Sequence, residues 1–483
     1  MSRRWWTLVA IGLATFMTYL DNNITNVALP TIERSLHLSV AGLEWVVSSY
    51  LLTLGGLLLA GGRLADVYGR RRMFQVGLVV FTVSSLVAGL AGSGAVLVAS
   101  RAVQGAGAAM LMPTTLAIIA ATFPDAKERA RAIAFWSACS AVALGCGPVA
   151  GGLISQHVRW GWIFLINVPV GAITLVISAV SMRESRADTA ERRPDLPGLI
   201  AISVTLFALT YALIEGNDKG WTSALIAIML ALAVVSLAAF LVIESRSSHP
   251  MVALSMFKTR EFSGGSGAMM IWAFGVLGIY FYTSIYLQDL LGFSPTKAGL
   301  AFVPMALCLA IGATIAPRVA AVIGAHRAVP FGMLLMTTGV CLFTLLGLRE
   351  GYGNLMPGFI AFGLGAGLMG VPLVGAIMAA TSPSRAGITS AMLNDSREVA
   401  ALIGITVIGA VLRARQSTAL RSGASHSQAY LDGFHTGLYV TISLMVLGIV
   451  VSFLTLRPRV SRGTAGSVAT SEQSAAGVPQ SSS

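Results

Sequence analysis

The residues of this chain that could do chemistry are ionisable side chains inside apolar stretches. Thr18, Asp21 and Thr25 follow one another at the spacing i, i+3 and i+7. This spacing places them on one face of a helix, which should contact other helices or a hydrated cavity instead of lipid. Because burial disfavours a charged carboxylate, we expect Asp21 to exchange a proton. The alternative is a structural carboxylate that only accepts hydrogen bonds from its neighbours.

A second ionisable group occurs in the apolar stretch 387–411. Asp395 and Glu398 are three residues apart and share a helix face, where two carboxylates would tend to hold one proton between them. Such a pair suits proton-linked uptake of a cation. Arg397 is adjacent, and in the alternative interpretation it only neutralises Glu398. Glu44 and Glu215 lie close to the ends of apolar stretches, and we expect both to be solvated at the membrane interface.

An arginine inside an apolar stretch also needs an explanation. Arg101 lies about a third of the way into the stretch 95–118. A cation within a membrane usually faces a partner or a cavity. The alternative is that Arg101 extends to the outer interface.

The elements that position these residues are expected to be membrane-spanning helices. The 483 residues are 55% hydrophobic and 11% charged, with a mean hydropathy of +0.78. Apolar runs of roughly 20 residues, enough to cross about 30 Å of hydrocarbon, recur along the chain, and helices satisfy their own backbone there. We therefore predict an all-α integral membrane protein with about fourteen spans, at 6–28, 43–62, 73–92, 95–118, 131–154, 161–181, 197–215, 221–243, 264–288, 296–317, 328–348, 354–379, 387–411 and 436–456.

The formal charge of +12 is a topological signal and does not indicate a nucleic-acid partner. Most of the 32 Lys and Arg fall in alternate connectors, as the positive-inside rule requires when both termini are cytoplasmic. The connector near Arg413 to Arg421 is an exception, since it places three arginines outside. The first apolar stretch follows Arg3 and Arg4 like a signal peptide, but we expect it to remain as the first span.

Long charged connectors predict the domain organisation. We expect an N-terminal six-helix bundle at 1–182, a linker with two extra transmembrane helices at 183–262, and a C-terminal six-helix bundle at 263–460. Residues 461–483 are rich in small and polar residues and should form a disordered cytoplasmic tail.

Two glycine-rich segments have spacings that suit moving helices. In the connector 61–72, glycines flank a single acid, so that Asp66 can accept hydrogen bonds from a helix start or an arginine and hold one state of a gate with Gly62, Gly69 and Arg70. The alternative is a plain basic connector. In the stretch 131–154, small residues allow close helix contact around a proline, forming a hinge or seal; these are Gly145, Gly147, Pro148, Gly151 and Gly152.

In order and spacing, these segments resemble the motifs of the major facilitator superfamily. The segments 20–30 (LDNNITNVALP) and 160–169 (WGWIFLINVP) resemble its fourteen-span drug:proton antiporter branch. The resemblance implies that Asp21 and Arg101 take part in proton coupling, Asp66 in a cytoplasmic gate, and the glycine segment in antiport. Val67 departs from the family pattern, which usually has a basic residue there, and the corresponding connector at 316–327 has no acid.

Aromatic and polar side chains on the expected spans are candidates for a substrate cavity, because rings bind flat or cationic compounds by stacking and cation–π contact. The alternative for each ring is packing against lipid or other helices. The candidates are Asn22, Thr25, Tyr50, Trp136, Tyr282, Tyr286 and Asn394.

These observations predict a proton-coupled antiporter that exports small amphiphilic or cationic compounds by alternating access across the cytoplasmic membrane. It should need no cofactor beyond the proton gradient, contact membrane lipid, and act as a monomer. The sequence has no GxxxxGK[ST] segment, no HExxH and no CxxC, so neither a nucleotide site nor a metal site is expected. The alternatives are a proton-linked importer with the same fold and an intramembrane enzyme.

Overall fold

The computed structural model describes residues 3–186, 196–247, 252, 254–348, 351–379, 381 and 386–457, and the expected tail at 461–483 lies outside them. The described part is helical. Its elements are α1 (Arg3–Leu36), α2 (Val40–Tyr68), α3 (Arg70–Gly89), α4 (Gly94–Thr122), α5 (Ala126–His157), α6 (Trp162–Leu165), α7 (Asn167–Ser181), α8 (Leu196–Lys219), α9 (Ala224–Arg246), a 3-10 turn η1 (Leu254–Lys258), α10 (Arg260–Ile285), a π-helical turn η2 (Tyr286–Leu290), α11 (Pro295–Ala301), α12 (Val303–Ile323), α13 (Ala325–Phe343), α14 (Tyr352–Ala379), α15 (Ala386–Arg421) and α16 (His426–Thr455).

Each predicted span coincides with a helix or with two consecutive helical segments. The sixth, ninth and tenth spans correspond to α6 with α7, α10 with η2, and α11 with α12. In the described part of the chain, twelve helical segments are long and apolar enough to cross a membrane. The two other long helices are α1 and α15, which carry Asp21 and the group around Asp395.

The prediction of an outer connector containing Arg413 to Arg421 is wrong. α15 continues through Arg421, and α16 begins at His426, so that only residues 422–425 connect them. Arg413 is buried, with 7% of its surface exposed. A charged residue can be buried within a membrane helix when another part of the protein supplies a partner for its charge.

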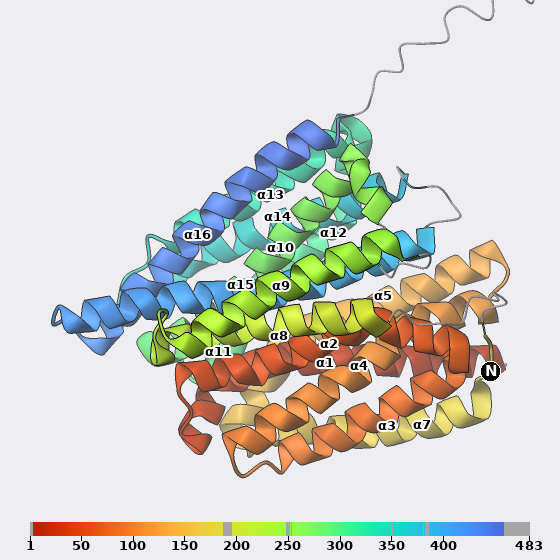
Figure 1. Ribbon diagram of the computed structural model, residues 1–483, viewed down its shortest axis with the longest axis horizontal. Coiled ribbons are helices and arrows are strands. Elements are labelled where there is room, and N and C mark those ends of the chain that lie inside the picture. Colours follow the sequence, from red (N-terminus) through yellow and green to blue (C-terminus); the bar gives the residue numbers. More distant parts are fainter. Residues whose placement is uncertain are drawn as a thin grey trace, which may run out of the picture.

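The helices on either side of α8 and α9 repeat one packing pattern. In the N-terminal half (α1–α7), α4 packs on α2 and α3, while α1 packs on α5 and α7. In the C-terminal half (α10–α16), α14 packs on α12 and α13, while α10 packs on α15 and α16. The lower and upper bundles in Figure 1 are these two halves. Such repeats place a transport site between two units that can move relative to each other.

The inserted helices α8 and α9 lie against the seam between the halves. α8 packs on α9 and also on α2 and α15, which belong to different halves. Figure 1 shows α8 and α9 between the two bundles. The insertion therefore contacts both halves.

The two halves are joined at the end of the molecule where α1 ends and α2 begins, which we call the Leu36 end. Ser284 Oγ donates to the backbone oxygen of Asn26 at 3.0 Å, and Gln288 Nε2 donates to that of Val27 at 2.8 Å. Nearby, α11 packs on α5, and Thr296 Oγ1 donates to the backbone oxygen of Gly152 at 3.3 Å. The seam at this end is closed by hydrogen bonds from side chains of one half to backbone oxygens of the other.

Candidate functional site

Asp21 lies at the centre of a polar cluster in the N-terminal half. Its side chain is fully buried. Arg101 Nη1 of α4 donates to Oδ2 at 2.5 Å, while Gln104 Nε2 and Asn167 Nδ2 donate to Oδ1 at 2.7 and 2.8 Å. Ser85 of α3 accepts a hydrogen bond from Gln104 at 2.7 Å. The cluster joins α1, α3, α4 and α7 and provides three donors for the carboxylate.

Arg101 faces this cluster and not the membrane interface, so the alternative of an extended, interfacial arginine is wrong. The side chain is fully buried, and its Nε donates to the backbone oxygen of Val46 at 3.2 Å. The guanidinium carbon lies 4.3 Å from the ring centroid of Tyr50 and 5.5 Å from that of Phe164. The two rings exclude water from the ion pair and interact with its cation.

The polar residues of α15 do not form the expected pair of carboxylates. Arg397 Nη2 forms an ion pair with Glu398 Oε1 at 2.7 Å and donates to the hydroxyl of Tyr19 at 3.3 Å, across the two halves. Asp395 is buried, with 8% exposed, and within the described part of the chain neither of its carboxylate oxygens has a hydrogen-bond partner. Glu398 is thus neutralised by its neighbour, whereas Asp395 is a buried acid that lacks such a partner.

The expectation that Glu44 is solvated at the interface is wrong. Glu44 of α2 is fully buried. Its Oε2 lies 3.1 Å from Arg413 Nη2 of α15, and the hydroxyl of Tyr282 of α10 donates to Oε1 at 2.9 Å. Sequence reasoning missed this cluster because its members are far apart in the chain. The available signal was Arg413 itself, an arginine where the positive-inside pattern expects few.

Glu215 differs from Glu44 and stays near the helix end, as expected. It forms an ion pair with Lys219 at 3.3 Å, one turn away on the same helix. Its Oε1 also accepts a hydrogen bond from Trp45 Nε1 at 2.9 Å. The Glu215 side chain is 19% exposed and that of Lys219 is 42% exposed, so water reaches this pair.

The connector between α2 and α3 holds its acid close to its own basic residues. Asp66 pairs with Arg70 at 3.1 Å, and Gly69 adopts a φ of 111°, which glycine tolerates best. The start of α3 is capped by Glu184, which accepts from the backbone N–H of Arg71 at 3.0 Å and which sequence analysis missed. A Cβ at Gly62 would lie 3.4 Å from Pro113 Cβ, an ordinary contact distance. The equivalent turn between α12 and α13 uses Gly324 with a φ of 83°.

The glycine segment of α5 provides close helix contacts, as predicted. A Cβ at Gly147 would lie 2.6 Å from Asn23 Cβ, and one at Gly151 would lie 2.5 Å from the backbone oxygen of Ile24, so both face α1. Gly152 faces α11, where a Cβ would lie 2.3 Å from the backbone oxygen of Pro295. Gly145 has open space beside it. Pro148 lies inside α5, and its backbone oxygen approaches Gly299 of α11.

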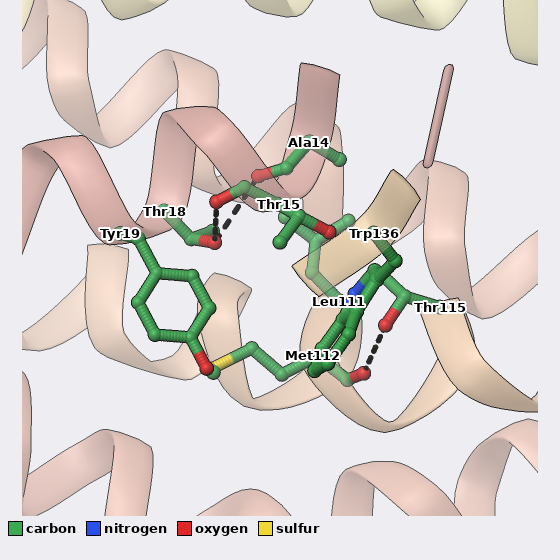
Figure 2. Close-up of a pocket in the computed structure, with 8 residues that line it drawn as sticks. All are labelled: Ala14, Thr15, Thr18, Tyr19, Leu111, Met112, Thr115 and Trp136. Carbon is green, nitrogen blue, oxygen red and sulfur yellow. Dashed lines mark hydrogen bonds between the residues drawn. The ribbon is translucent and has the colours of Figure 1, made fainter. Parts of the chain in front are cut away.

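A pocket opens between α1, α4 and α5 (Figure 2). Trp136 lines it, and the indole Nε1 and the Thr15 hydroxyl have no hydrogen-bond partner in the described part of the chain. Tyr19, which contacts Arg397, forms one wall opposite Trp136 (Figure 2). The full lining is Ala14, Thr15, Thr18, Tyr19, Leu111, Met112, Thr115 and Trp136.

The other expected cavity residues do not line this pocket. The hydroxyl of Tyr286 donates to the backbone oxygen of Gly347 at 2.7 Å, and Tyr282 belongs to the Glu44 cluster, so both rings are core residues. Tyr50 covers Arg101, and the hydroxyl of Thr25 donates to the backbone oxygen of Asp21. Asn22 and Asn394 are half-buried.

The comparison with protein families agrees with this architecture. The family model described as Major Facilitator Superfamily matches residues 11–405. The chain belongs to the major facilitator superfamily. It is thus a multi-pass membrane transporter of small molecules and not an enzyme. Transporters of this superfamily generally need no cofactor.

Curated relatives of this major facilitator are named for drug resistance and export. The chain is 37% identical to Multidrug resistance protein Stp of Mycobacterium tuberculosis (strain CDC 1551 / Oshkosh) over 416 residues. The matched segment covers 86% of this chain and 77% of the relative. It is 33% identical to Puromycin resistance protein pur8 of Streptomyces alboniger, over 92% of this chain and 89% of the relative. It is also 33% identical to Cephamycin export protein CmcT of Amycolatopsis lactamdurans, over 95% of this chain and 93% of the relative.

Solved structures confirm the major facilitator fold. A bacterial homolog to the human lysosomal transporter Spinster matches with a TM-score of 0.67 and 18% sequence identity, over 95% of this chain and 98% of that chain. The nucleoside transporter NupG, in a mutant form, matches with a TM-score of 0.63 and 10% identity, over 93% of this chain and 100% of that chain. At these identities the likeness shows the fold alone.

Proposed function

We propose that this transporter is a proton-coupled antiporter that exports small amphiphilic or cationic compounds across the cytoplasmic membrane by alternating access. The observation that carries the proposal is the fully buried ion pair between Asp21 and Arg101. A buried acid with a cation beside it can hold or release a proton as its surroundings change, at a large energetic cost if the charge loses its partner. Relatives named for resistance to, or export of, unlike compounds support export.

In this scheme both termini are cytoplasmic, so that the Leu36 end faces outward. Asp21, Asp395 and Glu398 take up or compete for the proton, and Arg101 stabilises their charged forms. At the cytoplasmic end, Asp66 and Arg70, with Gly62 and Gly69, form the gate. The protein works as a monomer with lipid around it.

The residues that line the pocket beside Trp136 are proposed contacts for the substrate. Tyr19, Met112 and Trp136 offer apolar and aromatic surface, and the unpartnered Thr15 hydroxyl and Trp136 indole offer polar contacts. Tyr19 connects this pocket to Arg397 of the C-terminal half. A bound amphiphile would therefore affect contacts in both halves. Asp395 would be available to a cationic group on the substrate.

The glycine segment of α5 supports antiport by holding α5 close to α1 and α11. Gly147 and Gly151 allow the contact with α1, and Gly152 allows the contact with α11. Since α11 belongs to the other half, this segment seals the outer end when the transporter is open to the cytoplasm. Gly145 and Pro148 complete the segment.

The test is transport of ethidium by purified protein in proteoliposomes under an imposed proton gradient. Asp21→Asn should abolish gradient-driven ethidium movement while the protein remains monodisperse. Asp432→Asn, a partly buried acid on α16 outside the cluster, is the matched control and should transport normally. Undiminished antiport by Asp21→Asn at a fixed gradient would contradict the proposal. Ethidium movement in the same direction as the protons would favour the importer.

A further inference from the structure

The cluster around Glu44 joins the two halves at the Leu36 end. Glu44 belongs to α2, and its two partners, Arg413 and Tyr282, belong to α15 and α10. The Glu44 carboxylate lies directly against α15, since a Cβ at Gly409 would lie 2.2 Å from Glu44 Oε1. This is a buried ion pair that crosses the seam which must open when the transporter faces outward.

The inserted helix α8 forms hydrogen bonds with α2 and α15 at the same site. Arg413 Nη2 donates to the backbone oxygen of Leu213 at 3.2 Å, and Asn217 Nδ2 donates to that of Ala410 at 2.8 Å. Trp45, next to Glu44, donates to Glu215 of α8. α8 therefore holds α2 and α15 together at one point.

The pair is incompletely satisfied. Glu44 Oε2 and the Nε and Nη1 atoms of Arg413 are buried and lack a hydrogen-bond partner in the described part of the chain. Separating two buried charges leaves each one uncompensated until water arrives, which opposes opening. Adding a proton to the carboxylate removes one of the two charges and hence most of that barrier.

We propose that Glu44 is a further proton-binding residue of the transport cycle, and that its ion pair with Arg413 keeps the outer end closed until a proton from outside neutralises it. In this step the proton adds to Oε2 of Glu44, the ion pair with Arg413 Nη2 breaks, and Arg413 keeps its charge and becomes hydrated as the seam opens. Tyr282 keeps its hydrogen bond to Oε1 with the neutral acid. The inference rests on the proposed function for its orientation and its proton gradient.

Other charged and titratable groups near Glu44 come from the neighbouring helices. Asp218 of α8 opposes the negative charge of Glu44, and Tyr430 of α16 lies within range of its field. Glu215 and Lys219 of α8 largely compensate each other. Arg413 is the cation paired with Glu44, so its charge decides how firmly the seam is held.

The experiment measures the distance across the outer end in full-length protein in nanodiscs. Spin labels are attached to cysteines replacing Ala95 at the start of α4 and Ser427 at the start of α16, both exposed, after the four native cysteines are replaced by serine. We expect a short distance at pH 7.5 and a growing population at longer distance at pH 5.5. Glu44→Gln should show the longer distance at both pH values.

Two further variants keep the test decisive. Arg413→Gln, which leaves Glu44 without its cation, should also show the longer distance at both pH values even if Glu44→Gln folds poorly. Asp432→Asn should respond to pH like the parent. A Glu44→Gln protein with the parent's pH response, or a parent with no response, would overturn the proposal.

The outcome is separable from that of the proposed function. The distance measurement needs neither substrate nor gradient, whereas the Asp21→Asn experiment measures coupled transport. A normal distance response with no proton-driven ethidium transport would leave the Glu44 assignment standing and remove the antiporter assignment.

Discussion

Two buried acid–arginine pairs in this transporter are built differently. Asp21 and Arg101 both belong to the N-terminal half, and Asp21 also accepts hydrogen bonds from Gln104 and Asn167. Glu44 and Arg413 belong to different halves, and several of their polar atoms lack partners among the described residues. In the proposed cycle the first pair would stay intact while the halves move, whereas the second would break when the outer end opens. The difference is one of placement: the first pair lies inside one half, and the second crosses the seam between the two halves.

Of the substitutions that test this comparison, the largest loss of unfolding free energy is expected at the pair within one half. Arg101→Leu leaves Asp21 buried without its cation, which should cost about 3–5 kcal/mol of unfolding free energy. The measurement is unfolding of purified protein in mixed micelles with increasing SDS. The double variant Asp21→Asn/Arg101→Leu is the control and should regain part of the loss. A loss from Arg101→Leu below about 1 kcal/mol would show that the pair does not stabilise the half, since removing one partner of a buried pair normally costs several times more.

A smaller loss is expected from Arg413→Leu in the same unfolding experiment. The pair is already short of hydrogen bonds, and separation of the two halves at the seam would hydrate Glu44, so we expect about 1–3 kcal/mol. Arg415→Leu, two residues further along α15 and exposed, is the matched control. A loss equal to that of Arg101→Leu would remove the distinction between the two pairs.

The glycine contacts at the same seam give a still smaller effect. A Cβ at Gly299 of α11 would lie 2.2 Å from the backbone oxygen of Pro148, so Gly299→Ala should disfavour the closed outer end by about 1 kcal/mol, the lower end for overpacking. The label pair at the outer end should report a larger fraction at long distance. Gly145→Ala, which meets nothing within 4 Å, is the control. Equal distance distributions for both variants would contradict this account of the seam.

The smallest effect should come from an acid–base pair that water reaches. Glu215→Gln removes the ion pair with Lys219 on α8 but keeps an oxygen for Trp45. Because exposed pairs contribute little, we expect an unchanged melting temperature in detergent and an unchanged pH response at the outer end. A marked drop in melting temperature would mean that this pair behaves like the buried ones.

Much of the fold could be predicted from local pattern. The fourteen apolar stretches became helices because each stretch is long enough to cross the bilayer and satisfies its own backbone. The polar face of Thr18, Asp21 and Thr25 was visible for the same reason, since helical periodicity is a local property. Helix ends were less predictable: α15 extends to Arg421, and Arg413 within it pairs with Glu44 from another helix.

The amino-acid sequence by itself determined that this protein is a bundle of membrane helices with ionisable residues inside it, because hydropathy and helical period act over neighbouring residues. Only the tertiary structure decided which charges meet. Arg101 could pair with Asp21 or extend to the interface, and Glu44 could be hydrated or buried against Arg413. The cost of a buried charge depends on groups that other helices bring within a few ångströms, and that proximity is set by packing across the whole molecule.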